Sequence, residues 1–236
     1  MKVLMSIARY LFIVSLPFLL LTAVIAGAVN CSWLYTHGFE KYNVRQSLAE
    51  NGFSLTGTDM TKIALGFIRY WNSNEQYINL TVQQQGQSVA LFNQDEIIHF
   101  RDVKKLFLLD YNVLIGTLFY CLFFSWVSVF RENGRYRKKL AVATLWGSGI
   151  TLGLMLALGI GTLVDFNNLF YDFHLLVFTN TFWSTEGNML LLFPDGFWYD
   201  AATYIVIGIA ALAVILGGSS WIYLARHKAK GRLFQP

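Results

Sequence analysis

The sequence predicts an all-α polytopic membrane protein, with four transmembrane helices and a small α+β domain of short helices and a β-hairpin between the first two. Hydrophobic residues make up 55% of the 236 residues and charged residues only 14%, whereas a soluble domain carries about 25% charged residues. Four apolar runs cover residues 10–29, 106–130, 140–164 and 201–224. Each run reaches the ~20 residues that a helix needs to cross a hydrocarbon core.

The four runs divide the chain into alternating spans and connections. Spanning helices are predicted over 1–30, 106–130, 140–164 and 201–225. The connections are a domain at 31–105, a short loop at 131–139, an aromatic-rich loop at 165–200 and a tail at 226–236. The first run is longer than the 7–15-residue core of a cleaved signal peptide, so we expect it to be retained as an anchor.

The distribution of charge predicts the orientation. The N-terminal end, the 131–139 loop and the tail together hold eleven basic residues and one acidic residue, Glu132. The 31–105 and 165–200 segments, with Asp110 just inside the second run, hold seven basic and 13 acidic residues. Because basic loops stay in the cytoplasm, we expect both termini there and the two larger segments on the extracytoplasmic side. Basic clusters beside helix ends are typical of contacts with anionic lipid, so we expect no nucleic-acid partner.

The extracytoplasmic domain has mixed patterns. Residues 31–48 are predicted to continue outward from the first span as a helix, and the apolar spacing of 59–71 predicts a second one. Two β-prone runs, 77–82 and 88–92, flank a Gly-containing linker and predict a β-hairpin. Because an isolated hairpin is only marginally stable in water, it is expected to pack on the short helices or the bilayer surface.

The last part of this domain carries the first candidate site residue. Asn93 followed by Glu96 is typical of a helix start, which predicts an amphipathic helix over 93–105 running into the second span. His99 then lies a turn or two above the membrane. Glu96 and Asp102 are within helical side-chain reach of it, and a carboxylate can hold an imidazole in one tautomer.

The 165–200 segment carries the second candidate, His174. It has no Lys or Arg, it is rich in Phe, Tyr and Trp, and its apolar stretches are too short to span. This pattern predicts a loop in the membrane interface that roofs or walls a cavity, because non-helical backbone at that depth must contact protein or water. The pattern alone leaves open that both histidines are interfacial residues without a function.

Other chemistries lack their motifs. No Cys/His cluster has zinc-site spacing, and no Gly-rich phosphate loop or nucleophile elbow is present, so no metal or cofactor is expected. Cys31 near the surface and Cys121 in mid-span are not expected to form a disulfide. A histidine pair without a nucleophile fits proton transfer. The intramembrane acid Asp110 is a functional candidate, or it caps its helix or pairs with a nearby lysine, Lys104 or Lys105.

Two segments resemble the signatures of a known family. The first is Glu-Ile-Ile-His-Phe-Arg-Asp-Val-Lys at 96–104, which is similar to a signature of Glu-Ile-x-His-Met followed by Asp-Val-Lys. The second comprises Phe-His at 173–174, Phe-Thr-Asn at 178–180, Trp183 and Phe-Pro-Asp-Gly-Phe-Trp-Tyr-Asp at 193–200. With the predicted topology, these segments make essentially the whole chain resemble the bacterial lipoprotein intramolecular transacylases, the Lit family.

The resemblance implies a specific reaction and site. These enzymes move an acyl chain from the glyceryl group of a diacylated lipoprotein to the α-amine of its N-terminal cysteine, which gives the lyso-form. By similarity His99 and His174 are the catalytic pair, and we assign the base role to His99. Substrate-binding or positioning roles are expected for the other motif residues, which are Glu96, Asp102, Lys104, Asn180, Trp183, Asp195 and Trp198. The implied partners are diacylated lipoproteins and membrane lipids, and the implied location is the bacterial cell membrane with the active site facing outward.

Two other functions compete with this one. A non-enzymatic membrane receptor or assembly factor would present the 31–105 domain to a partner and would not need either histidine. A transporter is less favoured, because only Asp110 interrupts the spans and no inverted repeat is visible.

Overall fold

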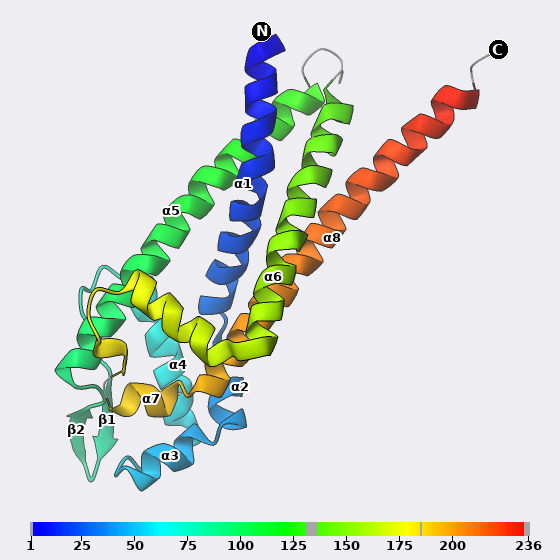
Figure 1. The fold of residues 1–236 in the computed structure, drawn as a ribbon. Coiled ribbons are helices and arrows are strands. Elements are labelled where there is room, and N and C mark those ends of the chain that lie inside the picture. The colour runs from blue at the N-terminus through cyan, green and yellow to red at the C-terminus, as the bar shows by residue number, and fades with distance from the viewer. Residues whose placement is uncertain (1, 131–135, 185, 234–236) are drawn as a thin grey trace. The chain divides into compact units, whose positions relative to one another are not determined.

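The computed structural model describes residues 2–130, 136–184 and 186–233, and Figure 1 shows its elements. Four helices are long and apolar enough to cross a membrane, which confirms the predicted number of spans: α1 (Lys2–Val29), α5 (Gln94–Phe130), α6 (Arg137–Val177) and α8 (Asp195–Leu233). The shorter elements are α2 (Ser32–Lys41), α3 (Val44–Glu50), α4 (Gly57–Trp71), β1 (Thr81–Gln84), β2 (Gln87–Ala90), η2 (Phe182–Ser184) and α7 (Asn188–Leu192). The charged residues at 131–135, including Glu132, were used to predict the orientation and lie outside the described residues.

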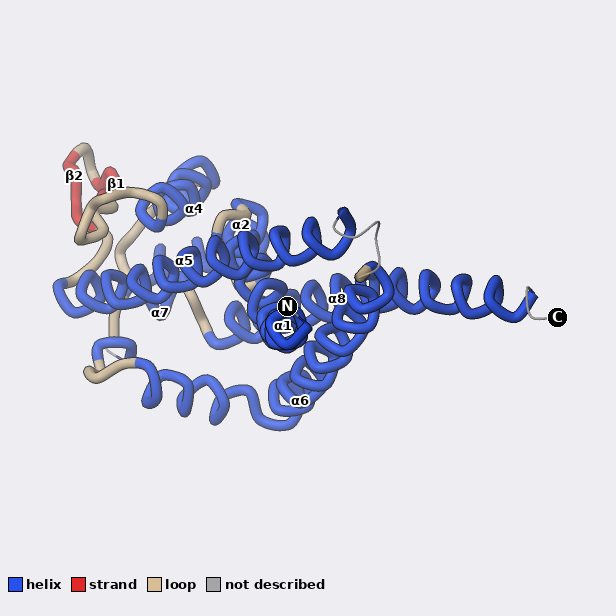
Figure 2. The backbone as a smooth tube through the Cα atoms, turned by 90° about the horizontal axis from the view of Figure 1, so that it is seen from above, coloured by secondary structure: helices blue, strands red, loops and turns tan. Residues whose placement is uncertain are grey.

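The chain forms two compact units. Unit 1 comprises Met1–Ile25, Asp110–Ile160 and Ile205–Pro236, and unit 2 comprises Ala26–Leu109 and Gly161–Tyr204. Figure 2 shows that most of the chain is helix and that the two short strands lie next to one another. Each long helix contributes residues to both units.

Unit 1 is a helix bundle with a narrow apolar core. Its buried residues come from all four long helices and are Phe12, Leu16, Leu20, Cys121, Phe124, Ala143, Met155, Ile209 and Ala213. At Gly147 an added Cβ would lie 3.2 Å from the carbonyl oxygen of Ile13, so a glycine is needed where α6 approaches α1. Small residues allow helices to pack closely in membranes; this applies at Gly147 but not at Gly149, where nothing lies within 4 Å of an added Cβ.

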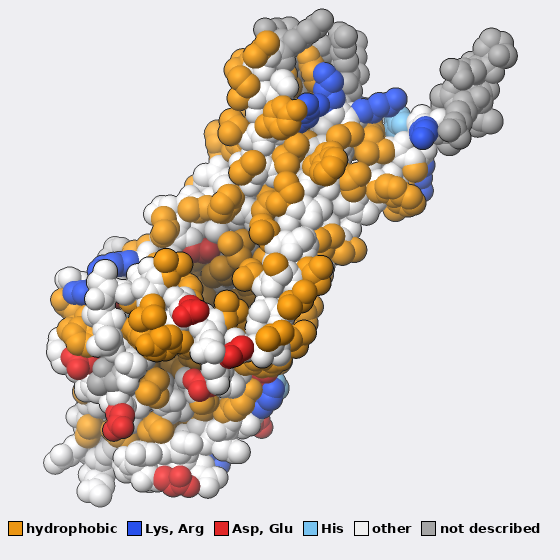
Figure 3. Space-filling view, in the orientation of Figure 1, with side chains coloured by type: hydrophobic (Ala, Val, Ile, Leu, Met, Phe, Trp, Pro, Cys, Tyr) orange, Lys and Arg blue, Asp and Glu red, His pale blue; other side chains and the backbone are white. Residues whose placement is uncertain are grey.

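The outer surface of the long helices is apolar. Only 17–22% of the most apolar window in each is buried inside the protein, and large side chains such as Phe119, Leu156 and Ile215 are more than half exposed. Figure 3 shows hydrophobic side chains over much of the visible helix surface. Soluble proteins rarely expose contiguous apolar patches of this extent, so these helices suit a lipid environment.

Unit 2 has a separate core made largely of aromatic rings. Its buried rings are Tyr35, Phe39, Phe67, Tyr70, Trp71, Phe92, Phe100, Phe193 and Phe197. Phe67 is fully buried and its ring centroid lies 5.1–6.2 Å from those of Tyr35, Phe100 and Phe193. Phe100, the residue after the first candidate histidine, is therefore part of this core and fixes the start of α5.

Two of the three predicted elements before α5 are confirmed. The 59–71 helix is α4, which begins at Gly57 after a capping box between Thr56 and Asp59. The hairpin pairs Thr81 with Ala90 and Gln84 with Gln87, and it packs on unit 2 through buried Val82. Its turn is shorter than the predicted linker, because Gln85 and Gly86 both have positive φ, as in the tight turns that match strand twist.

The single helix predicted over 31–48 is wrong. The structure has two helices, α2 and α3, separated at Asn43, whose φ of 52° lies in the left-handed region. Asparagine visits this region more readily than other non-glycine residues. The break follows Lys41 and Tyr42, which both bond Asp200 at the start of α8.

The 165–200 segment is more helical than predicted. Helix α6 continues to Val177 across a kink at Asp165, where φ is −158° and ψ is 83°. The Asp165 side chain accepts a hydrogen bond from the backbone N–H of Asn168 at 3.1 Å, so it caps the second part of the helix. Non-helical backbone is confined mainly to the stretch between α6 and α8, around η2 and α7.

Candidate active site

His99 is positioned by the first turn of α5. Asn93 and Glu96 form the predicted reciprocal cap: the Asn93 N–H donates to Glu96 at 2.7 Å, and the Glu96 N–H donates to the Asn93 side chain at 3.0 Å. His99 follows one turn later and is only 6% exposed. The cap therefore fixes the point at which the imidazole leaves the helix.

Glu96 also connects α5 to a distant segment. Its second carboxylate oxygen accepts a hydrogen bond from the Met189 N–H of α7 at 2.5 Å, and Glu96 itself is 1% exposed. A Cβ on Gly187 would overlap this carboxylate, so the glycine permits the close approach. Both oxygens are thus engaged by backbone groups, and Glu96 acts on the shape of the site rather than on the imidazole.

His174 lies near the C-terminal end of α6 and is also 6% exposed. Its Nδ1 is 2.7 Å from the carbonyl oxygen of Phe170, one turn earlier. Because a carbonyl only accepts hydrogen bonds, Nδ1 carries the proton and donates it. In the neutral ring the lone pair is then on Nε2. A backbone carbonyl holds this tautomer, whereas the sequence suggested a carboxylate.

The two histidines lie side by side within unit 2. Their ring centroids are 6.1 Å apart and their planes are inclined by 27°. Nδ1 of His99 is buried and has no hydrogen-bond partner among the described residues. Buried polar atoms are rarely left unpaired, so this nitrogen is a candidate contact for a substrate group.

Aromatic side chains surround the pair. Phe178 lies 4.9 Å from His99 and 5.4 Å from His174, measured between ring centroids. Phe170 and Trp183 lie 4.3 and 4.8 Å from His174. These rings exclude water from the imidazoles and provide an apolar surface of the kind that an acyl chain contacts.

A hydrogen bond between Asn180 and Asp102 holds the segment after α6 against α5. Asn180 donates to one oxygen of Asp102 at 3.1 Å, while Lys105 and Arg101 bond the other oxygen at 2.8 and 3.2 Å. The side-chain amide oxygen Oδ1 of Asn180 also accepts a hydrogen bond from the Phe182 N–H at 3.2 Å. This arrangement places Trp183 against His174, and it engages both Asp102 oxygens with groups other than His99.

The remaining predicted site residues lie outside the aromatic surroundings of the pair. Lys104 donates to the Glu75 carbonyl at 2.7 Å and to Ser73 at 3.2 Å. Trp198 stacks on Phe170 with centroids 5.7 Å apart, so it supports the residue that bonds His174. Asp195 lies in the first turn of α8.

Sequence analysis did not identify Phe170, and it included Phe178 in the second signature without assigning it a role at the site. Each is one helical turn from His174, and the signal was therefore the spacing of four residues on either side of it. The signal was overlooked because the segment was interpreted as a loop, in which this spacing has no meaning.

Other candidate chemistry is limited. Within residues 2–130, 136–184 and 186–233, no three His, Cys, Asp or Glu side chains gather in a way that could hold a metal ion. Cys31 is exposed and Cys121 buried, and both are free. Asp110 has one buried oxygen without a partner among the described residues, while the two lysines proposed to pair with it bond other groups.

A polar cluster lies beside the start of α8. Lys41 and Tyr42 bond the same Asp200 oxygen at 2.6 and 2.9 Å. The hydrogen bond to Asp200 raises the pKa of Lys41, and partial burial raises the pKa of the Tyr42 phenol. Both groups therefore keep their protons at neutral pH and hold α2 to the last motif.

Comparisons with known proteins agree with one another. A family model described as lipoprotein intramolecular transacylase Lit matches residues 10–198. The chain is similar to a solved structure of the membrane integral lipoprotein intramolecular transacylase Lit from Bacillus cereus, with a TM-score of 0.78 and 21% identity over 98% of this chain and 100% of that one. Two further structures of that protein, each with one histidine substituted, have TM-scores of 0.74 at 21% identity. They cover 98% and 97% of this chain, and 96% and 97% of their own. The comparison with curated proteins gave no match.

Proposed function

Because the chain belongs to the Lit family of lipoprotein intramolecular transacylases, we propose that its two buried histidines, His99 and His174, perform the acyl transfer. The protein is a multi-pass membrane acyltransferase that moves an acyl chain within a lipoprotein. The enzyme assignment replaces the alternative of a non-enzymatic receptor or assembly factor. The finer proposal is that an ester-linked chain moves from the diacylglyceryl group to the α-amine of the N-terminal cysteine and leaves the lyso-form.

The observation that carries the proposal is the 6.1 Å separation of the two rings. At this distance both imidazoles can contact one reacting group. Each is 6% exposed, and two positive charges placed this close in an apolar surrounding would repel strongly. The pair therefore suits a reaction in which one ring accepts a proton while the other stays neutral and donates a hydrogen bond.

The tautomer of His174 indicates which of the two imidazoles acts as the general base. His174 presents its unprotonated Nε2 because Nδ1 donates to Phe170, and it is the general base that takes a proton from the attacking amine. His99 donates a hydrogen bond to the ester carbonyl oxygen, and protonated His174 then passes its proton to the departing alkoxide. The base role predicted for His99 therefore moves to His174 in this proposal.

The bond changes balance without a co-reactant. The amine nitrogen attacks the ester carbonyl carbon, the new C–N bond forms, and the C–O bond to the glyceryl group breaks. The proton from nitrogen goes to His174, which then passes it to the alkoxide, so both rings end in the protonation states in which they began. The products are an amide and a free glyceryl hydroxyl, and both remain in the same molecule.

The surroundings favour transfer over hydrolysis. Donor and acceptor belong to one substrate, so bringing them together avoids the entropy cost of a bimolecular encounter. The rings of Phe170, Phe178 and Trp183 keep water from the ester while it is activated.

Other motif residues act by position. We assign Glu96, Asp102 and Asn180 to holding the segments that carry the aromatic rings. Trp198 supports Phe170. Lys104 and Asp195 belong to the scaffold of unit 2, and no contact of either with the imidazoles supports a role in the chemistry.

The active site is proposed to face the extracytoplasmic side of the bacterial cell membrane. Support comes from the charge distribution, since the acidic excess falls in the segments that carry both histidines. Cys31, an exposed thiol of unit 2, provides the test. A membrane-impermeant maleimide should label it in intact cells, whereas labelling only after lysis would contradict this orientation.

The function is tested in bacteria that cannot N-acylate their lipoproteins. Expression of this chain should place an acyl group on the α-amine of the N-terminal lipopeptide and remove one from the glyceryl group, as read by tandem mass spectrometry. His99→Ala and His174→Ala should each abolish the change. His227→Ala is the matched control, because His227 bonds a backbone carbonyl one turn away in the same manner but is exposed. A free amine in cells that contain well-expressed protein would refute the proposal.

A further inference from the structure

Unit 1 contains a pocket that the acyl-transfer chemistry does not use. It lies where α1 begins, α5 ends and α6 begins, and its cavity volume is about 160 Å³. A single water needs about 10–15 Å³ by the same measure, so the pocket has room for a larger group. Each unit contains a pocket, and the pocket in unit 1 is lined by two cationic side chains.

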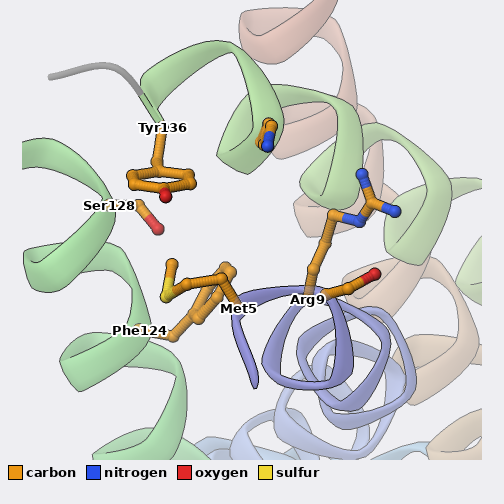
Figure 4. Close-up of a pocket in the computed structure, with 7 residues that line it drawn as sticks. Met5, Arg9, Phe124, Ser128 and Tyr136 are labelled. Carbon is orange, nitrogen blue, oxygen red and sulfur yellow. The ribbon is translucent and has the colours of Figure 1, made fainter. Parts of the chain in front are cut away.

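The lining is rich in hydrogen-bond donors. Two cations, Arg9 of α1 and Lys139 of α6, line the pocket together with the hydroxyls of Ser6, Ser128 and Tyr136. Figure 4 shows Arg9 extending from α1, and Ser128 and Tyr136 with their hydroxyl groups near one another. Ser128 and Tyr136 are 1% and 8% exposed, so these donors are built into the helix contacts rather than scattered on the surface.

Among residues 2–130, 136–184 and 186–233, no carboxylate lines the pocket. Among the residues that the structure describes, neither Arg9 nor Lys139 forms an ion pair. Each cation lies over a tyrosine ring instead, Arg9 over Tyr10 at 5.1 Å and Lys139 over Tyr136 at 5.0 Å. Two cations that pair with no carboxylate of the described residues, together with three hydroxyls, form a site for an anion with several acceptor oxygens.

We propose that this pocket binds a phosphate group. Guanidinium and ammonium groups are the usual partners of phosphate oxygens, and the hydroxyls can donate to the oxygens that the cations leave free. The two sources of such a group in a membrane are a phospholipid headgroup and free phosphate.

The apolar residues favour the headgroup. Met5 and Phe124 form the non-polar part of the lining, and Val3 and Leu4 at the same end of α1 are 73% and 68% exposed. A phospholipid can place its phosphate against the cations and its acyl chains along these side chains. This end of the chain carries the basic residues that predict the cytoplasmic face, where anionic lipids gather.

The test uses the purified full-length protein and compares ligands that differ only in the phosphoglycerol headgroup. Dioleoylphosphatidylglycerol and dioleoylglycerol share their acyl chains, but only the first has a phosphate. Native mass spectrometry should show one retained phosphatidylglycerol and no retained dioleoylglycerol. The thermal unfolding midpoint should rise with the phospholipid, because a ligand that binds only the folded state stabilises it.

Single substitutions distinguish binding in this pocket from nonspecific attraction of the lipid to surface cations. Arg9→Gln and Lys139→Gln should each weaken phosphatidylglycerol binding about tenfold, and Tyr136→Phe should weaken it less. Lys138→Gln is the matched control, since Lys138 is an exposed cation adjacent to Lys139 that does not line the pocket. Unfolding midpoints measured without added lipid show whether each variant is folded.

The outcomes are distinct. Stabilisation by the phospholipid but not by inorganic phosphate identifies the headgroup as the ligand, whereas equal stabilisation by inorganic phosphate identifies the free anion. Retention of dioleoylglycerol as strongly as phosphatidylglycerol, or an equal loss of binding in Lys138→Gln and Arg9→Gln, would overturn the proposal. None of these results depends on acyl-transfer activity.

Discussion

Replacing Glu96 by alanine tests the connection between the two halves of the active site. In the native protein the Glu96 carboxylate accepts hydrogen bonds from the backbone N–H groups of Asn93 and Met189. Leaving a buried donor without a partner costs about 1–3 kcal/mol. With one buried and one partly buried donor affected, we expect the free energy of unfolding to fall by about 2–4 kcal/mol.

The loss of stability should be measurable as a lower thermal unfolding midpoint and as faster hydrogen exchange at the affected amides. For a chain of this size each 1 kcal/mol corresponds to roughly 2–4 °C in Tm, so Glu96→Ala should lower the midpoint by about 5–15 °C. Hydrogen exchange at the Met189 amide should accelerate, because its acceptor is gone. Glu96→Gln keeps one acceptor oxygen and should lose about half as much.

Asp95→Ala is the matched control for this prediction. It removes the neighbouring carboxylate, which is half-buried, and should leave both the Tm and the exchange of the Met189 amide close to wild type. If Glu96→Ala unfolds at the wild-type temperature, or if Met189 exchange is unchanged, the reasoning about this residue is wrong.

Three further predictions concern other parts of the structure. Asn180→Ala removes the bond to Asp102 and should lower the acyl-transfer rate several-fold while leaving the secondary structure seen by circular dichroism unchanged; an unaltered rate would mean that this bond does not position the site. Gly147→Val should destabilise unit 1 by about 1–3 kcal/mol through overpacking, whereas Gly149→Ala, at an open position, should not lower the Tm, and equal effects would contradict the helix contact. Burial raises the pKa of Tyr70 to about 12 from 10, so the folded state holds this proton more tightly and stability should fall by about 1.4 kcal/mol per pH unit between pH 10 and 12. Tyr70→Phe should lose that slope, and chemical denaturation across this pH range provides the comparison.

Local sequence signals predicted the elements that depend on local interactions. The Asn93 and Glu96 spacing correctly indicated the start of α5, because a capping box involves only residues within one turn. The hairpin was found for the same reason, although its turn at Gln85 is tighter than expected. The four spans followed from hydrophobic runs, whose length is set by the bilayer.

Long-range contacts were not predictable in the same way. The sequence placed Glu96 and Asp102 within reach of His99, but the structure gives their oxygens to Met189 and Asn180, which are far along the chain. Spacing shows which side chains share a helix face, and it does not show which distant groups compete for them. The sequence pattern indicated both histidines as candidates on the same side of the membrane, and the resemblance of two motifs to a family assigned them as a catalytic pair.

The kink at Asp165 explains the misread loop. The segment was interpreted as a loop because its apolar stretches are too short to span, although Asp165, Asn168 and Asp172 follow a helical spacing within α6. Once α6 is seen to continue to Val177, the carbonyl of Phe170 lies one turn before His174. The tautomer of the proposed base is thus fixed by a backbone contact that only the helix creates.

The central claim is that His99 and His174 act together on one substrate, and the most direct test is the transfer rate of the two single variants and the double variant. Purified His99→Ala, His174→Ala and the double variant would be incubated with a synthetic diacylated lipopeptide, and the N-acylated product would be followed by mass spectrometry. Each single variant should be slower by about 10²–10⁴-fold, and the double variant should be no slower than the worse single, because residues that act as a unit lose their effect together. A single variant that retains the wild-type rate, or losses that multiply in the double variant, would contradict the account.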